Sequence, residues 1–170
     1  MNSGTLRAFA AMVITLFGSA VSASEQPISH AAESFVQKGV SVVLKSCAPL
    51  SKAKPCRHGK FLREMRKHGT NQWGVRIRSQ EVFYDGLEAV YRNNEVVQLH
   101  VTKPNWPMMF DLRVGTLSTK VRQALGTPTR TGADSNYETL EYCKGENCAA
   151  FYVDIPSGRV TAVLWLFYYD

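Results

Sequence analysis

Three side chains in the middle of the sequence could perform acid–base chemistry. Asp85 and Glu88 precede His100, and if these positions lie on adjacent strands, a carboxylate and an imidazole could meet and exchange a proton with a substrate. Gly86 follows Asp85, and an Asp-Gly pair is typical of a tight turn, which explains Asp85 without chemistry. The sequence contains no Gly-x-Ser-x-Gly, His-Glu-x-x-His or phosphate-binding glycine motif. We therefore expect a protein without catalytic residues, and an envelope hydrolase is a distant alternative.

Four cysteines could bind a metal, exchange electrons or form disulfides. Cys47 and Cys56 bracket a loop rich in Pro and Lys, and Cys143 and Cys148 bracket residues 144–147. Four cysteines allow three pairings, of which local pairing within each bracket is the simplest. A four-thiolate zinc site is the alternative, but neither pair has the usual Cys-x-x-Cys spacing. We expect two disulfides, no metal and no cofactor.

The first 23 residues have the features of a cleavable signal peptide. Arg7 precedes an apolar run over residues 8–18, and Val21-Ser22-Ala23 supplies small residues for cleavage. A retained membrane anchor is the alternative. No cysteine follows the apolar run closely, so we expect no lipid anchor. The sequence predicts a periplasmic or secreted protein that does not span the membrane, with residues 24–170 as one domain.

The stretch 114–128 predicts a short helix with clear end signals. Ser118 can cap its first turn, Gly126 allows a left-handed exit, and Pro128 stops it. Apolar spacing predicts further helices over 29–46 and 60–69, the first of which could also be a strand. Alternation predicts strands over 73–78, 82–92, 96–102, 140–142, 150–153 and 158–165.

The predicted hairpins 87–101 and 149–166 share one layout, each with a strand, a turn and a strand that opens on valine. We therefore predict an α+β fold, with helices packed on one face of an antiparallel sheet and two tandem helix-plus-three-strand repeats over about 58–103 and 112–170. Chance similarity between two hairpins is the alternative.

The helix at 114–128, with the strands that follow it, resembles the repeat of the BamE/SmpA envelope proteins and of the beta-lactamase inhibitor protein superfamily. The resemblance implies an envelope location, disulfides in the loops, and a concave sheet face that grips an enzyme. The chain departs from BamE because it lacks the cysteine that carries lipid.

Strand alternation predicts which side chains lie on the open face of the sheet. The inward residues would be Leu87, Ala89, Tyr91, Val97, Leu99 and Val101, then Phe151, Val153, Ile155, Ala162, Leu164 and Leu166. The outward residues would include a partner-binding set of Tyr152, Trp165, Phe167, Tyr169, Arg92 and His100. Aromatic side chains beside cations suit a protein-binding surface. A second core under the amino-terminal helix, or a dimer contact, is the alternative for the aromatic residues.

Positive charge is concentrated in one segment. Residues 45–78 carry ten Lys or Arg against Glu64 alone. The predicted basic patch comprises Lys52, Lys54, Arg57, Lys60, Arg63, Arg66 and Lys67. Because nucleic acid is a poor partner for an exported protein, anionic lipid or glycan is the expected ligand, and a solvated helix face is the alternative.

These patterns favour a protein-binding module of the inhibitor or immunity type that occludes another envelope or secreted protein. An envelope-assembly or maintenance accessory resembling BamE/SmpA is the alternative.

Overall fold

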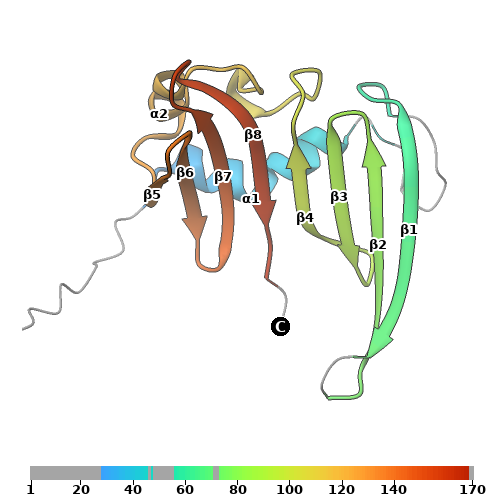
Figure 1. Ribbon diagram of the computed structural model, residues 1–170. Helices are drawn as coiled ribbons and strands as arrows, with labels where there is room; N and C mark the ends of the chain where they lie inside the picture. Colours follow the sequence, from blue (N-terminus) through green and yellow to red (C-terminus); the bar gives the residue numbers. More distant parts are fainter. Residues whose placement is uncertain (1–27, 46, 48–55, 71–72, 169–170) are drawn as a thin grey trace, which may run out of the picture.

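The computed structural model describes residues 28–45, 47, 56–70 and 73–168, and its main feature is one eight-stranded antiparallel sheet (Figure 1). The strand order is β1-β2-β3-β4-β8-β7-β6-β5. The helical elements are α1 (His30–Leu44), the 3-10 turn η1 (Met109–Asp111) and α2 (Ser118–Leu125). The strands are β1 (Phe61–Thr70), β2 (Arg76–Tyr84), β3 (Leu87–Arg92), β4 (Glu95–Val101), β5 (Arg130–Ala133), β6 (Tyr137–Lys144), β7 (Asn147–Asp154) and β8 (Arg159–Leu166).

The sheet consists of two groups of four strands. We call β1–β4 the first half-sheet and β5–β8 the second half-sheet; in each, strands that follow one another in sequence are paired. The halves join where β4 pairs with β8, from Gln98↔Leu166 to Val101↔Val163. Asn93 and Asn94 have positive φ angles of 51° and 72°, as a tight hairpin turn between β3 and β4 requires.

Helix α1 lies on one side of the sheet, where it contacts β6, β7, α2 and η1 (Figure 1). Ser29 caps the helix by accepting a hydrogen bond from the Ala32 amide at 3.1 Å, and its hydroxyl donates to the Leu125 carbonyl at the end of α2. One face of α1 is buried against the sheet: Ala32, Phe35, Val36, Gly39, Val40 and Val43. Neither this helix nor any other in the described residues has the length and apolar content needed to cross a membrane.

The predicted fold class, an α+β fold of helices packed on a sheet in two tandem repeats, is wrong, because the described residues form mostly one eight-stranded antiparallel sheet with two α-helices. Residues 60–69, predicted as a helix, instead form most of β1, whose backbone pairs with β2 along its length. The apolar residues Phe61, Leu62 and Met65 fit a helical face in the sequence, but long-range pairing overrides that local preference. Each half-sheet also has four strands rather than three, because 60–69 adds β1 to the first half and the unpredicted β5 adds a strand to the second. The predicted strand 82–92 is divided by a turn at Asp85 and Gly86, and its first part belongs to β2. Two tandem helix-plus-three-strand repeats are therefore absent from the described residues.

The helix predicted within 114–128 is present as α2 and ends at Gly126 with a positive φ of 82°, but its ψ of −158° lies outside the left-handed helical region. Its start differs from the prediction. Leu117, and not Ser118, is the residue at the cap, with no side-chain hydrogen bond. The Ser118 amide instead donates a hydrogen bond to the Gly158 carbonyl at 2.9 Å. The β7–β8 turn therefore supplies an acceptor for one of the free amide groups at the start of α2.

Candidate functional site on the open face of the sheet

The side of the sheet opposite α1, which we call the open face, carries a row of side chains across all eight strands. The strand registers place one residue from each strand in this row: Arg63, Phe83, Glu88, His100, Leu164, Ala150, Glu141 and Arg130. Charged residues lie at both ends, and apolar residues lie on β8 and β7. The open face is therefore apolar over part of the second half-sheet.

A hollow of about 640 Å³ lies over this apolar part. Its apolar lining comes from Cys148, Ala150, Leu164 and Leu166, with the rings of Tyr152 and Tyr168. Its charged lining comes from Arg130 on β5, Glu141 on β6 and Glu146 in the β6–β7 turn. A concave apolar surface with a few charged groups at one edge is the usual composition of a binding site.

Strand β8 is apolar on both of its faces. Val160, Val163 and Trp165 are buried towards α1, while Ala162, Leu164 and Leu166 are half-buried on the open face. Two-sided apolar strands are typical of sheets that are covered on both sides. Helix α1 covers only one side of β8, so the open side has the composition of a covered surface.

The face prediction for β8 is wrong, and a β-bulge explains the error. The register shifts between Tyr152 and Val153, so that Val153 pairs with Val160 while Tyr152 pairs with Ala162. The extra residue, Thr161, reverses the direction of every later side chain in β8. The predicted inward residues Ala162, Leu164 and Leu166 therefore lie on the open face, and Ile155 is 48% exposed.

Trp165, predicted to contact a partner, belongs to the core. It is fully buried, its ring stacks on Phe35 with centroids 5.1 Å apart, and its Nε1 donates to the Phe35 carbonyl at 3.3 Å. Phe167 is half-buried against the same core. For Trp165, the alternative of a core under the amino-terminal helix is correct.

The other predicted contact residues have different positions. Tyr152 lines the hollow, and His100 lies next to Leu164 in the row of the open face. Arg92 is exposed at the end of β3, outside the hollow, and Tyr169 lies outside the described residues.

In the first half-sheet Val97, predicted to point inward, is only half-buried. A bulge at Val90 and Tyr91 pairs Tyr91 with Val96 instead.

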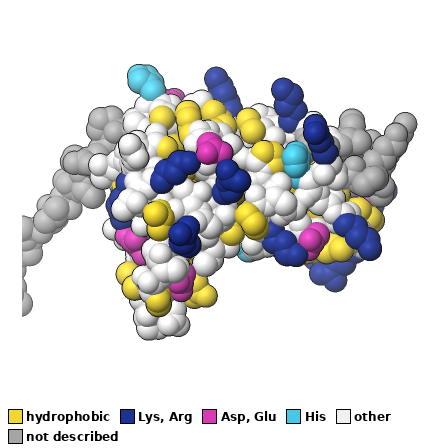
Figure 2. All heavy atoms as spheres, turned by 90° about the horizontal axis from the view of Figure 1, so that it is seen from above, with side chains coloured by type: hydrophobic (Ala, Val, Ile, Leu, Met, Phe, Trp, Pro, Cys, Tyr) yellow, Lys and Arg dark blue, Asp and Glu magenta, His cyan; other side chains and the backbone are white. Residues whose placement is uncertain are grey.

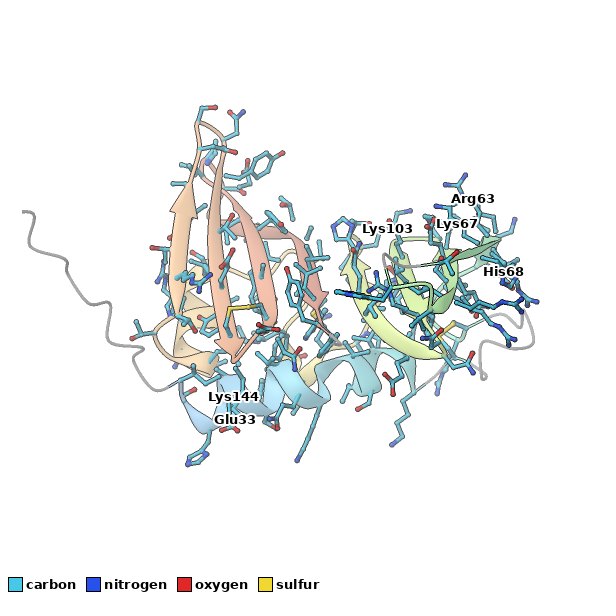
Figure 3. The ribbon with its side chains drawn as sticks, turned by 90° about the horizontal axis from the view of Figure 1, so that it is seen from below. Glu33, Arg63, Lys67, His68, Lys103 and Lys144 are labelled. Atoms are coloured by element: carbon cyan, nitrogen blue, oxygen red, sulfur yellow. A yellow bond between two sulfur atoms is a disulfide. The ribbon has the colours of Figure 1, made fainter. Side chains whose placement is uncertain are left out.

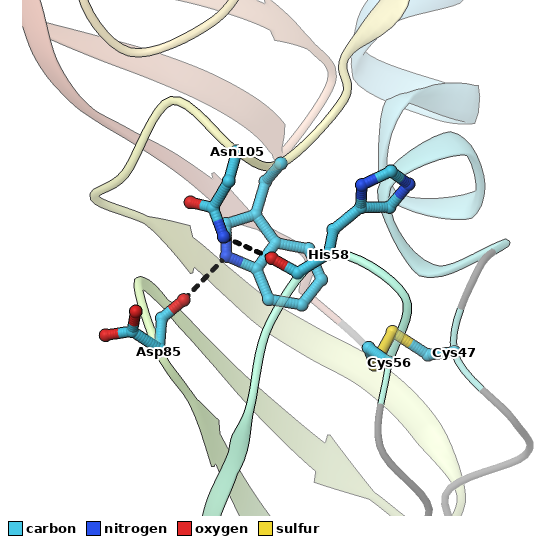
Figure 4. The surroundings of a disulfide bond; sticks show 6 residues. Cys47, Cys56, His58, Asp85 and Asn105 are labelled. Atoms are coloured by element: carbon cyan, nitrogen blue, oxygen red, sulfur yellow. Dashed lines mark hydrogen bonds between the residues drawn. A yellow bond between two sulfur atoms is a disulfide. The ribbon is translucent and has the colours of Figure 1, made fainter.

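The proposed acid–base trio is not assembled as a catalytic group. Glu88 and His100 are direct neighbours across β3 and β4 on the open face. Asp85 lies in the β2–β3 turn, where its carboxylate pairs with Lys103 Nζ at 2.6 Å and its carbonyl accepts from Trp106 Nε1 at 3.0 Å (Figure 4). Asp85 therefore stabilises a turn.

The basic patch does not lie on a helix, because most of its described members belong to the edge strand β1. Arg63 lies 4.3 Å from the centroid of the Phe83 ring, and Lys67 pairs with Glu81 at 2.7 Å (Figure 3). Arg66 forms an ion pair with Glu64. Two further members, Lys60 and Arg57, lie just before β1. The remaining two, Lys52 and Lys54, lie outside the described residues. Figure 2 shows Lys and Arg side chains interspersed with acidic and apolar ones on the face seen from above. The positive charge of the described patch residues is therefore partly paired.

Both disulfides have the predicted local pairing. Cys47 joins Cys56, which connects the end of α1 to the start of β1 (Figure 4), and Cys143 joins its cross-strand neighbour Cys148 at the wall of the hollow. The four cysteines therefore do not form a four-thiolate zinc site. Among the described residues, no three His, Cys, Asp or Glu side chains are grouped as metal ligands.

The sequence prediction missed most of the hollow. Leu164 and Leu166 were assigned to the core, and Arg130, Glu141, Glu146 and Tyr168 were not selected. The run from Val160 to Phe167 contains a signal for the hollow, because apolar residues occupy both even-numbered and odd-numbered positions there and so lie on both faces of the strand.

The sequence matches no protein-family model and no curated protein. Similar solved structures include the following two. The protein YfeY from Escherichia coli is 13% identical with a TM-score of 0.38, over 62% of this chain and 82% of that chain. An extracellular protein containing an SCP domain, from Bacillus anthracis str. Ames, is 10% identical with a TM-score of 0.43, over 75% of this chain and 42% of that one. At these scores the similarity carries no argument, and the resemblance to the BamE/SmpA and inhibitor families stays a prediction.

Proposed function

We propose that this protein is a non-enzymatic binding module that holds another protein in the hollow on the open face of the second half-sheet. The observation that carries the proposal is the composition of β8. Leu164 and Leu166 place apolar area on the side that α1 leaves uncovered, and burying such area stabilises a complex by about 25 cal/mol per Å² before the costs of association.

The lining of the hollow indicates the chemistry of the partner. Its floor fits apolar side chains, and Tyr152 and Tyr168 add rigid aromatic surface that also offers hydroxyl groups. Arg130 on one side and Glu141 and Glu146 beside it would orient a partner segment that carries both charges. An extended protein segment with an apolar centre and charged flanks fits these features.

The compartment follows from the cysteines. Two disulfides are characteristic of proteins in oxidising compartments. We place the protein in the periplasm or the extracellular medium, and we propose that it acts as an inhibitor or immunity protein by occluding a secreted or envelope protein there.

A capture experiment with matched variants tests this proposal. The native protein, Leu164→Asp and Val90→Asp would each be incubated with envelope and culture-medium extracts, and retained proteins identified by mass spectrometry. Val90 is the control because it is a half-buried apolar residue on the same face in the first half-sheet. We expect one protein that the native chain and Val90→Asp retain and Leu164→Asp loses.

That protein should then form a one-to-one complex in sedimentation analysis. Its affinity should fall by roughly tenfold or more for Tyr152→Ala, which truncates a side chain in the hollow without introducing a charge. Circular dichroism would establish that each variant is folded. Equal retention by Leu164→Asp and Val90→Asp would refute the choice of surface, and capture of outer-membrane assembly proteins by all variants would favour an accessory role instead.

A further inference from the structure

The hairpin of β1 and β2 projects beyond the rest of the sheet (Figure 1). Pairing of β2 with β3 ends at Ser79↔Arg92, whereas pairing of β1 with β2 continues to Thr70↔Arg76. We call residues 66–70 and 73–78 the arm. The arm is a two-stranded ribbon, unlike the four-stranded region from which it extends.

Large apolar side chains lie at the outer end of the arm. Trp73 is 76% exposed and Val75 is 56% exposed, whereas Trp106 and Trp165 are both fully buried. An exposed tryptophan has a large apolar ring and one N–H donor, a combination that favours the boundary between water and the interior of a lipid bilayer.

Positive charge lies directly behind this tip. Residues 66–78 contain four Lys or Arg and no Asp or Glu. Arg76 and Arg78 alternate with Val75 and Ile77, and the register places His68 beside Arg78 on one face of the ribbon. Arg66 and Lys67 pair with Glu64 and Glu81 at the base, so the positive charge towards the tip comes from Arg76 and Arg78.

We propose that the arm docks on an anionic phospholipid bilayer, with Trp73 and Val75 in the interfacial layer and Arg76 and Arg78 at the phosphate groups. A soluble polyanion would need only the cations, whereas a bilayer presents an anionic layer over an apolar one, in the order in which the arm presents cations and apolar side chains. This site is separate from the hollow, so one surface can be removed while the other is kept.

The tryptophans provide a selective probe. Because Trp106 and Trp165 are fully buried, a change of tryptophan emission on adding vesicles would report mainly Trp73. With vesicles containing phosphatidylglycerol and a bromine-labelled lipid, we expect a blue shift and quenching. With phosphatidylcholine vesicles we expect neither, and added salt should weaken the binding.

Matched charge variants test whether vesicle binding depends on the arginines of the arm or only on the net charge of the protein. Each basic residue at an anionic surface is worth about 1 kcal/mol, so Arg76→Gln with Arg78→Gln should weaken vesicle binding about thirtyfold in a sedimentation assay. Arg92→Gln with Lys38→Gln is the control, because it removes the same charge from exposed basic residues outside both the arm and the hollow. Leu164→Asp should bind vesicles like the native protein.

Three results would overturn the proposal: no binding to phosphatidylglycerol vesicles, binding without a change in tryptophan emission, or equal weakening by the two double variants. None of these results bears on the hollow, since capture of a partner protein would be unaffected.

Discussion

The two half-sheets bury their inner faces in different ways. The second half-sheet is covered by α1 and α2, and its core contains Phe35, Phe151 and Trp165 in ring contact. The first half-sheet is covered in part by loops, where Trp106 lies edge-on to Tyr84 with ring centroids 5.8 Å apart, and the Cys47–Cys56 disulfide holds the start of β1 near α1. Both halves share one core, in which the second half has the closer helix packing and the first half adds an aromatic cluster beside a disulfide.

A buried tryptophan nevertheless has the same role in each half. Trp165 Nε1 donates to the Phe35 carbonyl, and Trp106 Nε1 donates to the Asp85 carbonyl. Each ring also packs against a glycine. A Cβ at Gly59 would lie 2.3 Å from Cζ2 of Trp106, and one at Gly39 would lie 3.0 Å from Nε1 of Trp165. A side chain at position 59 would therefore clash with Trp106, and one at position 39 would press against Trp165.

The largest expected effect is the loss of either buried tryptophan. We expect Trp165→Ala and Trp106→Ala each to lower the free energy of unfolding by roughly 3–5 kcal/mol, because each leaves a large cavity. Trp73→Ala is the control and should change stability by less than about 0.5 kcal/mol, since its side chain is exposed. Urea unfolding measures all three.

Hydrogen exchange sharpens the same comparison. Trp165→Ala should reduce protection first in α1 and β6–β8, and Trp106→Ala first in β1–β3. An identical loss of protection over the whole sheet for both variants would show that the two halves are one cooperative unit and would contradict this division.

The next largest effects should come from the disulfides. Cys47–Cys56 closes a separation of nine residues and Cys143–Cys148 one of five. Loop-closure entropy gives roughly 2.5 and 2 kcal/mol for removing them by Cys→Ser pairs. The second value is an upper value, because Cys143 and Cys148 are already neighbours in the β6–β7 ladder. A greater loss of stability for the Cys143–Cys148 pair, measured by thermal unfolding, would contradict this order.

Features set by local signals were predictable from the sequence. Helix α2 ends at Gly126 and the β3–β4 turn lies at Asn93 and Asn94, because Gly and Asn adopt positive φ angles more readily than other residues. Local cysteine pairing was also predicted, since each pair is separated by few residues. The helix predicted over 29–46 is present as α1.

Features set by distant contacts were not predictable. The apolar spacing of residues 60–69 fits a helix, and only their hydrogen bonding to the distant strand β2 makes them a strand. Likewise, no local pattern shows that Thr161 is the extra residue of a bulge. That one residue decides whether Trp165 or Leu164 lies on the open face. Tyr152 lies on β7, whose alternation the bulge in β8 leaves unchanged, so Tyr152 lies on the open face as predicted and lines the hollow.

The smallest effects should come from a buried tyrosine in each half. Tyr142 in β6 donates its hydroxyl to the Gly126 carbonyl at 3.1 Å, whereas the hydroxyl of Tyr91 in β3 is buried without a hydrogen-bond partner among the described residues. Tyr142→Phe should therefore cost about 1 kcal/mol. Tyr91→Phe should be neutral or slightly stabilising, because it removes a buried polar group that has no partner there. Urea unfolding at neutral pH compares them, and a greater cost for Tyr91→Phe would show that its hydroxyl has a partner after all.

Alkaline titration extends this last comparison to the ionised state. Burial raises the pKa of Tyr142 to about 12, with Arg122 opposing the rise and Glu138 adding to it, and burial also raises the pKa of Tyr91 above its usual value of 10.0. Above pH 10 the unfolded chain releases these protons while the folded chain keeps them, so the stabilisation present below pH 10 is lost as pH rises towards the folded pKa. Each tyrosine should contribute a slope of up to about 1.4 kcal/mol per pH unit in that window. Phe at either position should remove its share of the slope, and an unchanged slope in Tyr142→Phe would show that its phenol ionises as readily in the folded state as in the unfolded chain.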